Sequence, residues 1–208
     1  MNGQRCEIGL AQPTHAPEAA EGPHTPGQGA LFLLLLEDGT DEMRAAIDDQ
    51  LDAVAAWWVK DPPEGPGFRQ VEPDYPPTGW HDVERFLATS GIREVEPHVP
   101  LVLYVTGHGI TSGATMHYAV LRDTLPERLL ATGLRTTEVI VAALDSLSQD
   151  VLVIANMCES SDVGSELQAM ERDLTHRTRS ATLHVLATAG PQRKVPAGAF
   201  AAILREEY

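Results

Sequence analysis

Residues Leu101-Val-Leu-Tyr-Val-Thr106, which lead directly into Gly107-His108-Gly109, decide the fold class of this 208-residue chain. Two similar runs, Leu31–Leu36 and Val151–Ala155, lie on either side of them in the sequence. Continuous apolar runs of this length are typical of strands buried on both faces. Residues 41–60 separate the first two runs and carry apolar side chains every three to four positions, as an amphipathic helix does. This alternation predicts an α/β fold with a mostly parallel sheet flanked by helices.

The same patterns predict the shorter elements of the fold. We expect further strands at residues 68–71, 116–121 and 183–189, and helices at 80–89, 136–147, 164–177 and 197–206. A polar loop is expected after Gly109, and residues 125–132 are expected to be irregular or helical. Thr136 or Thr137 is expected to cap its helix with a side-chain hydroxyl.

The first residues of the chain differ in composition from the rest. Residues 1–29 are rich in Pro, Gly, Ala and Glu and lack periodic hydrophobicity, which predicts a flexible N-terminal tail. Residues 30–208 show no internal boundary, and we expect them to form one domain. The chain ends soon after a predicted helix with no closing strand, which leaves open that it is a fragment of a longer multidomain protein.

The excess of acidic over basic residues disfavours negatively charged partners. The chain has 30 acidic and 15 basic residues and a formal charge of -15, so phosphate backbones and anionic lipid would repel it. We therefore expect neither a nucleic acid nor a membrane as a partner. No apolar run is long enough to span a bilayer. Two cysteines, Cys6 and Cys158, are too few for a disulfide framework and suit a reducing, cytoplasmic location.

Residues capable of chemistry follow each of the three strong strands. Glu37-Asp38 follow the first strand, His108 the second, and Asn156-Met157-Cys158 the third. The carboxyl ends of parallel strands share one edge of a sheet, where sites in α/β proteins form. A neighbouring imidazole can take the thiol proton, and the thiolate can then attack a carbonyl. The backbone N–H groups of Gly109 and Cys158 are candidates to hold the developing oxyanion.

Together these residues resemble the caspase and metacaspase cysteine peptidases, especially bacterial caspase-like members. The matching stretches are Tyr104–Gly109 and Val151–Ser160. The His precedes the Cys by 50 residues, similar to the spacing of about 50 in caspases. Further similar segments, which correspond to later strands and helices, bring the resemblance to about residues 31–205: 117–121, 132–136, 185–190 and 198–200. The resemblance implies a caspase-like three-layer sandwich over residues 30–208.

By this resemblance the chain is expected to be a cysteine endopeptidase that forms an acyl-enzyme. Cys158 would be the nucleophile and His108 the general base or acid, with a protein or peptide as substrate. No metal or other cofactor is expected, and the remaining histidines, His117 among them, have no metal-ligand spacing. The family also implies a regulatory or sensor domain or partner chain, and a bacterial role in programmed cell death or defence against phage.

The resemblance also suggests residues that bind substrate. Thr106 and Asn156 occupy positions, two residues before the His and the Cys, that border the P1 pocket in the family. Metacaspases often carry Asp, and caspases Gln, at the position of Asn156. Asp38 is expected to form an acidic wall of this pocket. Because Asp38 and the overall acidity favour cations, we expect a basic P1 side chain.

Two alternatives stay open. The first is a catalytically inactive interaction module of the same fold, in which Cys158 is an inert buried thiol and His108 a solvated loop residue. In that case Asp38 would cap a strand end and Asn156 would bond local backbone. The second is a cysteine hydrolase acting on a small amide. Such enzymes commonly add an Asp and a Lys to the Cys, and the two lysines lie at no strong strand end: Lys60 and Lys194.

Overall fold

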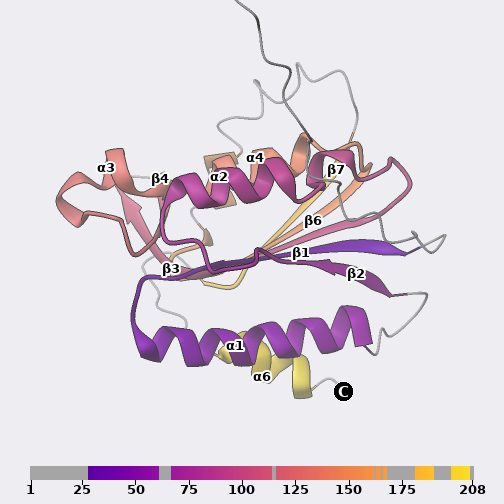
Figure 1. Ribbon diagram of the computed structural model, residues 1–208, viewed down its shortest axis with the longest axis horizontal. Coiled ribbons are helices and arrows are strands. Elements are labelled where there is room, and N and C mark those ends of the chain that lie inside the picture. The colour runs from indigo at the N-terminus through magenta and orange to yellow at the C-terminus, as the bar shows by residue number, and fades with distance from the viewer. Residues whose placement is uncertain are drawn as a thin grey trace, which may run out of the picture.

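The computed structural model describes residues 28–60, 67–113, 116–161, 163–164, 166–167, 181–189 and 198–206. Nearly all of the predicted tail, Cys6, Lys194 and most of the predicted helix at 164–177 lie outside these residues. Within the described residues, a seven-stranded, mostly parallel sheet lies between two layers of helices (Figure 1). The expected α/β fold is therefore confirmed.

Five strands form the parallel part of the sheet, in the order β2–β1–β3–β6–β7. The three strong apolar runs of the sequence form its three central strands, β1, β3 and β6. The five strands are β1 (Gly29–Leu36), β2 (Phe68–Val71), β3 (Leu101–Ser112), β6 (Asp150–Met157) and β7 (Thr182–Ala187).

Strand β3 belongs to two parts of the sheet. Its residues 101–107 pair in parallel with β1 and β6, whereas residues 108–112 pair antiparallel with β4 (Met116–Val120). The short strand β5 (Leu134–Arg135) pairs with the far side of β4 and was not expected from the sequence. The prediction of a polar loop directly after Gly109 was wrong, because β4 supplies backbone partners to β3 as far as Ser112.

Helices cover both faces of the sheet (Figure 1). One face carries α1 (Asp41–Ala55), which continues as the π-helical segment η1 (Ala56–Lys60), together with α6 (Ala199–Glu206). The opposite face carries α2 (Trp80–Thr89) and α4 (Thr136–Leu144). Three short helical segments connect these elements: η2 (Ile92–Glu94), η3 (Pro126–Arg128) and α3 (Leu129–Thr132).

The start of α4 differs from the prediction. Arg135 is the residue before the helix, and no side chain caps this end. Thr136 and Thr137 are the first two helical residues, and their hydroxyl groups hydrogen-bond to His117 and Glu166 instead. The prediction of a threonine cap was therefore wrong, because these hydroxyls satisfy buried partners in other elements.

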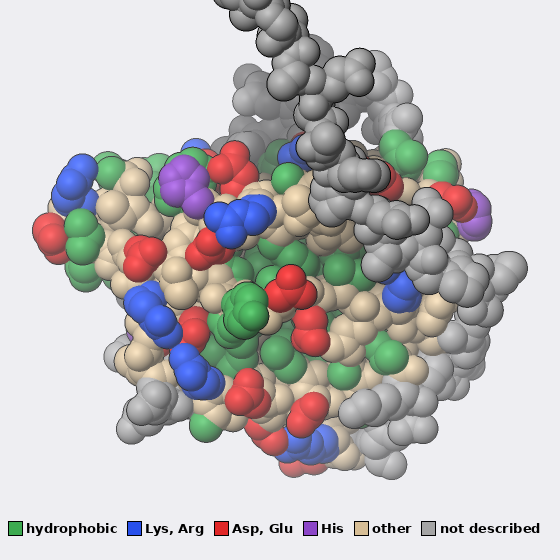
Figure 2. Space-filling model, in the orientation of Figure 1, with side chains coloured by type: hydrophobic (Ala, Val, Ile, Leu, Met, Phe, Trp, Pro, Cys, Tyr) green, Lys and Arg blue, Asp and Glu red, His purple; other side chains and the backbone are tan. Residues whose placement is uncertain are grey.

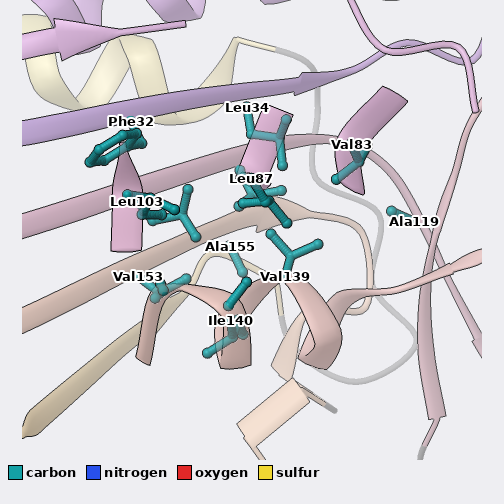
Figure 3. Packing of buried hydrophobic residues seen from close by; sticks show 14 of the residues in the cluster. Phe32, Leu34, Val83, Leu87, Leu103, Ala119, Val139, Ile140, Val153 and Ala155 are labelled. Carbon is teal, nitrogen blue, oxygen red and sulfur yellow. The ribbon is translucent and has the colours of Figure 1, made fainter. Parts of the chain in front are cut away.

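The core explains why the central strands are continuously apolar. In β1, Phe32 and Leu34 pack toward α2 and α4 (Figure 3), whereas Leu31 and Leu33 belong to a second cluster with residues of α1 and α6. Successive side chains of a strand point to opposite faces, so both faces of β1 are buried. Replacing a buried leucine of this core by alanine, for example Leu103 of β3, would lower the free energy of unfolding by about 2–5 kcal/mol. If a strand shifted its pairing by one residue, each of its side chains would move to the opposite face of the sheet. Packing of both faces therefore fixes the register of the strands and the positions of the residues that follow them.

No described helix combines the length and apolar character needed to cross a membrane. On the face drawn in Figure 2, acidic and basic side chains are interspersed among the described residues.

Candidate active site

The carboxyl ends of β1, β3 and β6 meet at one edge of the sheet, where β1 leads into α1 and β4 branches off (Figure 1). Gly107 is paired with Leu36 on one side and with Met157 on the other. His108 and Cys158 directly follow the paired residues Gly107 and Met157, on strands that lie about 4.8 Å apart. The structure therefore places the predicted His and Cys at neighbouring positions of this edge.

The side chain of His108 is partly exposed and faces Asp38. Its side chain is 45% exposed, and its Nδ1 lies 4.0 Å from Oδ2 of Asp38, whose side chain is 15% exposed. The other carboxylate oxygen of Asp38, Oδ1, accepts hydrogen bonds from the backbone N–H of Thr40 at 2.9 Å and from its hydroxyl at 2.8 Å. Asp38 is thus held within its own loop and faces the imidazole of His108.

Cys158 begins the turn that follows β6 and is a free, partly buried thiol. Its carbonyl oxygen lies 2.8 Å from Nε2 of His117, a fully buried residue of β4. The other ring nitrogen, Nδ1, lies 2.8 Å from the hydroxyl of Thr136. Because a carbonyl only accepts hydrogen bonds, Nε2 of His117 carries a proton. His117, which the sequence did not assign to the site, holds the backbone of the proposed nucleophile.

The backbone of Gly109 lies against the carbonyl oxygen of Cys158 and the ring of His117. A Cβ at this position would lie 2.4 Å from the carbonyl oxygen of Cys158 and 2.7 Å from Nε2 of His117, so only glycine fits. Two residues further on, the N–H of Thr111 donates to Oε2 of Glu159 at 2.8 Å. Backbone N–H groups two residues apart on a strand point to the same edge. The N–H of Gly109 therefore points toward the Cys158 turn, as an oxyanion donor would require.

The turn after Cys158 is fixed on both sides. Glu159 has a φ of 57°, in the left-handed region that few residues other than glycine adopt, and its carboxylate binds β3 through Thr111. On the other side, the hydroxyl of Ser160 accepts a hydrogen bond from the N–H of Ala189 at 3.2 Å, and the N–H of Ser161 donates to the Ala189 carbonyl at 2.9 Å. These contacts hold the thiol-bearing turn between β3 and the segment after β7.

A buried network of uncharged polar side chains lies on the α1 face of the same edge. Oε1 of Gln50 accepts hydrogen bonds from Tyr104 at 2.8 Å, from Thr106 at 3.0 Å and from the amide of Asn156. The Asn156 amide also donates to the Tyr104 hydroxyl at 2.8 Å, and its Oδ1 accepts from Thr188 at 2.9 Å. Burial raises the pKa of Tyr104, although hydrogen bonds with Asn156 and Thr106 act in the opposite direction. Its hydroxyl therefore stays protonated and can donate.

This network contains two of the three residues predicted to bind substrate. Thr106 is 2% exposed and Asn156 is 6% exposed, so neither presents a free polar group at the surface. The side chains on the α1 face of β3 are two residues apart along the strand: Tyr104, Thr106 and His108. The third predicted residue, Asp38, contacts His108 and Thr40. The structure thus brings Thr106 and Asn156 together beneath His108, with Asp38 beside the imidazole.

Glu37, the neighbour of Asp38, has a different environment. It is buried, and its carboxylate binds Nε of Arg44 at 2.9 Å and Nη2 of Arg122 at 3.2 Å. The backbone N–H of Arg122 also donates to the Glu37 carbonyl at 2.9 Å. The charge of Glu37 is therefore paired with two guanidinium groups, and the cluster ties the end of β1 to α1 and to the turn after β4. The sequence indicated the two acidic residues together but not this division between them.

Metal binding has no geometric basis in the part of the chain that the structure describes. There, no three His, Cys, Asp or Glu side chains converge in a way that could hold a metal ion.

No protein-family model matches the chain, and no curated protein matches its sequence. The interpretation of the site therefore depends on its geometry and on the chemistry of its residues.

Proposed function

We propose that the protein is a caspase-like cysteine endopeptidase, with Cys158 as nucleophile and His108 as general base and acid. The observation that carries this proposal is the position of the two residues, directly after a cross-strand pair of β3 and β6. The backbone of Gly109, pressed against the Cys158 turn, adds the expected oxyanion donor. A mostly parallel sheet between two helical layers is consistent with the caspase-like sandwich.

In the proposed reaction, His108 takes the proton of the Cys158 thiol. The thiolate sulfur attacks the carbonyl carbon of the scissile peptide bond, and the N–H groups of Gly109 and Cys158 bind the oxyanion. The imidazolium of His108 then gives its proton to the leaving amine as the C–N bond breaks. A water molecule loses a proton to His108 and attacks the thioester, which releases the carboxylic acid and restores the thiol.

The surrounding contacts support this reaction by holding its parts in place. His117 fixes the Cys158 carbonyl, and Glu159 joins the nucleophile turn to β3. The interaction of Thr106 and Asn156 with Gln50 gives an uncharged floor on the α1 face, where we place the P1 side chain. A basic P1 side chain would have to reach Asp38, because Arg44 and Arg122 already pair with Glu37.

The test is cleavage of a peptide library that varies the P1 residue, by a Cys6→Ser protein and by its Cys158→Ala derivative. The proposal predicts cleavage that depends on Cys158, and the preferred P1 residue reads out the pocket directly. Cleavage that survives Cys158→Ala would contradict the proposed nucleophile. Absence of cleavage, together with alkylation of Cys158 no faster than that of an ordinary thiol, would contradict the enzyme proposal.

The second candidate is an inactive interaction module of the same fold. The observation in its favour is the closed network, in which Asn156 and Thr106 are buried and already hydrogen-bonded. A slow, ordinary rate of Cys158 alkylation would favour this candidate.

The remaining expectations depend on the resemblance and form part of the same proposal. They are a cytoplasmic bacterial protein, a regulatory or sensor domain or partner chain, and a role in cell death or phage defence. Coexpression with candidate partners and measurement of Cys158-dependent toxicity would test them.

A further inference from the structure

The contact between Asp38 and His108 assigns a role to Asp38 beyond that of a pocket wall. We propose that Asp38 is a positioning residue for His108: its carboxylate accepts the Nδ1 proton and so directs Nε2 of the ring to Cys158. The inference rests on the proposed Cys–His function and adds a third member to that pair.

The position of Asp38 is fixed by the fold. Leu36 pairs with Gly107, so the loop that starts at Glu37 lies beside the residue after Gly107, which is His108. Within that loop, Thr40 holds Oδ1 of Asp38 through both its backbone N–H and its hydroxyl. This leaves Oδ2 as the oxygen that faces Nδ1 of His108, at 4.0 Å.

The separation of 4.0 Å is longer than a hydrogen bond, and it suits a group that moves during the reaction. Catalytic hydrogen bonds are often long in free enzymes and shorten in the substrate complex. The side chain of His108 is 45% exposed, whereas Asp38 is held at its other oxygen. We therefore expect the imidazole, rather than Asp38, to move when the contact closes.

The chemical effect has two parts. A carboxylate at Nδ1 selects the tautomer in which Nδ1 carries the proton, which leaves the Nε2 lone pair for the thiol proton. Once His108 has taken that proton, the negative charge of Asp38 stabilises the imidazolium. The carboxylate keeps its own charge throughout, as the orienting aspartate of a serine-type triad does.

The other charged groups around this edge do not duplicate that role. Glu37, on the same loop, is paired with Arg44 from α1 and with Arg122 from the turn after β4. Glu159, on the turn after β6, binds the N–H of Thr111. Asp38 is therefore the carboxylate that we expect to act on His108.

The first experiment is ¹⁵N NMR of the histidine side chains, which reports the tautomer without any need for peptidase activity. We expect neutral His108 to carry its proton on Nδ1, and Asp38→Ala to shift the population toward the Nε2–H form. Asp38→Asn keeps an acceptor and removes the charge, and Thr40→Val keeps the carboxylate and removes one of its anchors. Asp48→Asn makes the same charge change at an exposed site of α1 and serves as the control. Identical His108 signals in the wild type and Asp38→Ala would overturn the inference.

The second experiment separates this inference from the proposed function. In a Cys6→Ser background, the rate of Cys158 alkylation by iodoacetamide is measured at about pH 6, below the ordinary thiol pKa of about 8.5. We expect His108→Ala to lower the rate roughly tenfold or more, Asp38→Asn to lower it about threefold to tenfold, and Asp48→Asn to leave it unchanged.

The two failures have different signatures. A rate that falls in His108→Ala but not in Asp38→Asn would overturn the role of Asp38 and leave the Cys–His pair intact. A rate that falls in neither variant would contradict the Cys–His pair itself, and the role of Asp38 with it.

Discussion

Two histidines flank the Cys158 turn, and they differ in burial and in hydrogen bonding. His117 on β4 is fully buried, and its two ring nitrogens lie 2.8 Å from the Cys158 carbonyl and 2.8 Å from the Thr136 hydroxyl. His108 on β3 is 45% exposed, and its Nδ1 lies 4.0 Å from Oδ2 of Asp38. A buried imidazole with both nitrogens engaged holds backbone in place. An exposed imidazole that can rotate is suited to exchange protons with a thiol and a substrate.

The largest effect expected from this comparison is the loss of activity in His108→Ala. Removal of a general base typically lowers kcat/KM by roughly 10²–10⁴-fold. Because the side chain is 45% exposed and has no hydrogen bond within the described residues, we expect the free energy of unfolding to change by no more than about 0.5 kcal/mol. Peptide cleavage and urea denaturation measure the two quantities. A large loss of stability would show that His108 is structural, like His117.

His117→Leu should have the opposite profile, with its main effect on stability. The substitution leaves the Cys158 carbonyl and the Thr136 hydroxyl without their partner, and each unsatisfied buried group costs about 1–3 kcal/mol. Urea denaturation at neutral pH should therefore show a loss of about 2 kcal/mol or more. His117→Gln, which can still donate to the carbonyl, should recover part of it. Unchanged stability in His117→Leu would remove the distinction between the two histidines.

Gly109→Ala tests the close contact between the two sides of the site. The added Cβ would lie 2.4 Å from the Cys158 carbonyl oxygen, so either β3 or the Cys158 turn must move. Overpacking of this kind costs about 1–3 kcal/mol, and we expect a loss of peptidase activity with it. Gly164→Ala is the matched control, because among the described residues a Cβ there meets no atom within 4 Å. Equal effects of the two substitutions on the thermal midpoint would contradict the packing described for Gly109.

The smallest expected effect concerns the network beneath His108. Tyr104→Phe removes hydrogen bonds with Gln50 and Asn156 and should cost about 1 kcal/mol at pH 8. Burial raises the pKa of Tyr104 above that of an unfolded tyrosine, about 10, so its stabilising contribution is complete below pH 10 and is lost as the pH rises beyond it. The difference in urea midpoint between wild type and Tyr104→Phe should therefore shrink above pH 10. A constant difference would contradict burial of a protonated hydroxyl.

The sequence predicted the layers of the fold well, because burial on both faces leaves a strong signal. The continuous apolar run of β1 and the limits of β2 and α2 agree with the prediction. The extension of β3 beyond Gly109 could not be predicted, since Gly-His-Gly followed by Ile-Thr-Ser is also typical of a loop. Its pairing depends on β4, the next strand along the chain, and backbone pairing of this kind leaves no periodic pattern in the side chains of β3.

The candidate site could be predicted only in part. His108 and Cys158 follow strong strands, and register alone brings them to one edge. His117 could not be assigned, because its role depends on three segments that meet only in the fold: β4, the start of α4 and the turn after β6. The closed network around Asn156 likewise depends on Gln50 from α1, which the sequence does not connect to the site.

The most direct test of the central claim is the rate of Cys158 alkylation in the Cys6→Ser protein and in its His108→Ala and His117→Gln derivatives. The measurement is made at about pH 6, where an ordinary thiol is almost entirely protonated. A Cys–His pair predicts fast alkylation that falls roughly tenfold or more in His108→Ala and much less in His117→Gln. Slow alkylation that is unchanged in His108→Ala would contradict the account and identify Cys158 as an inert thiol.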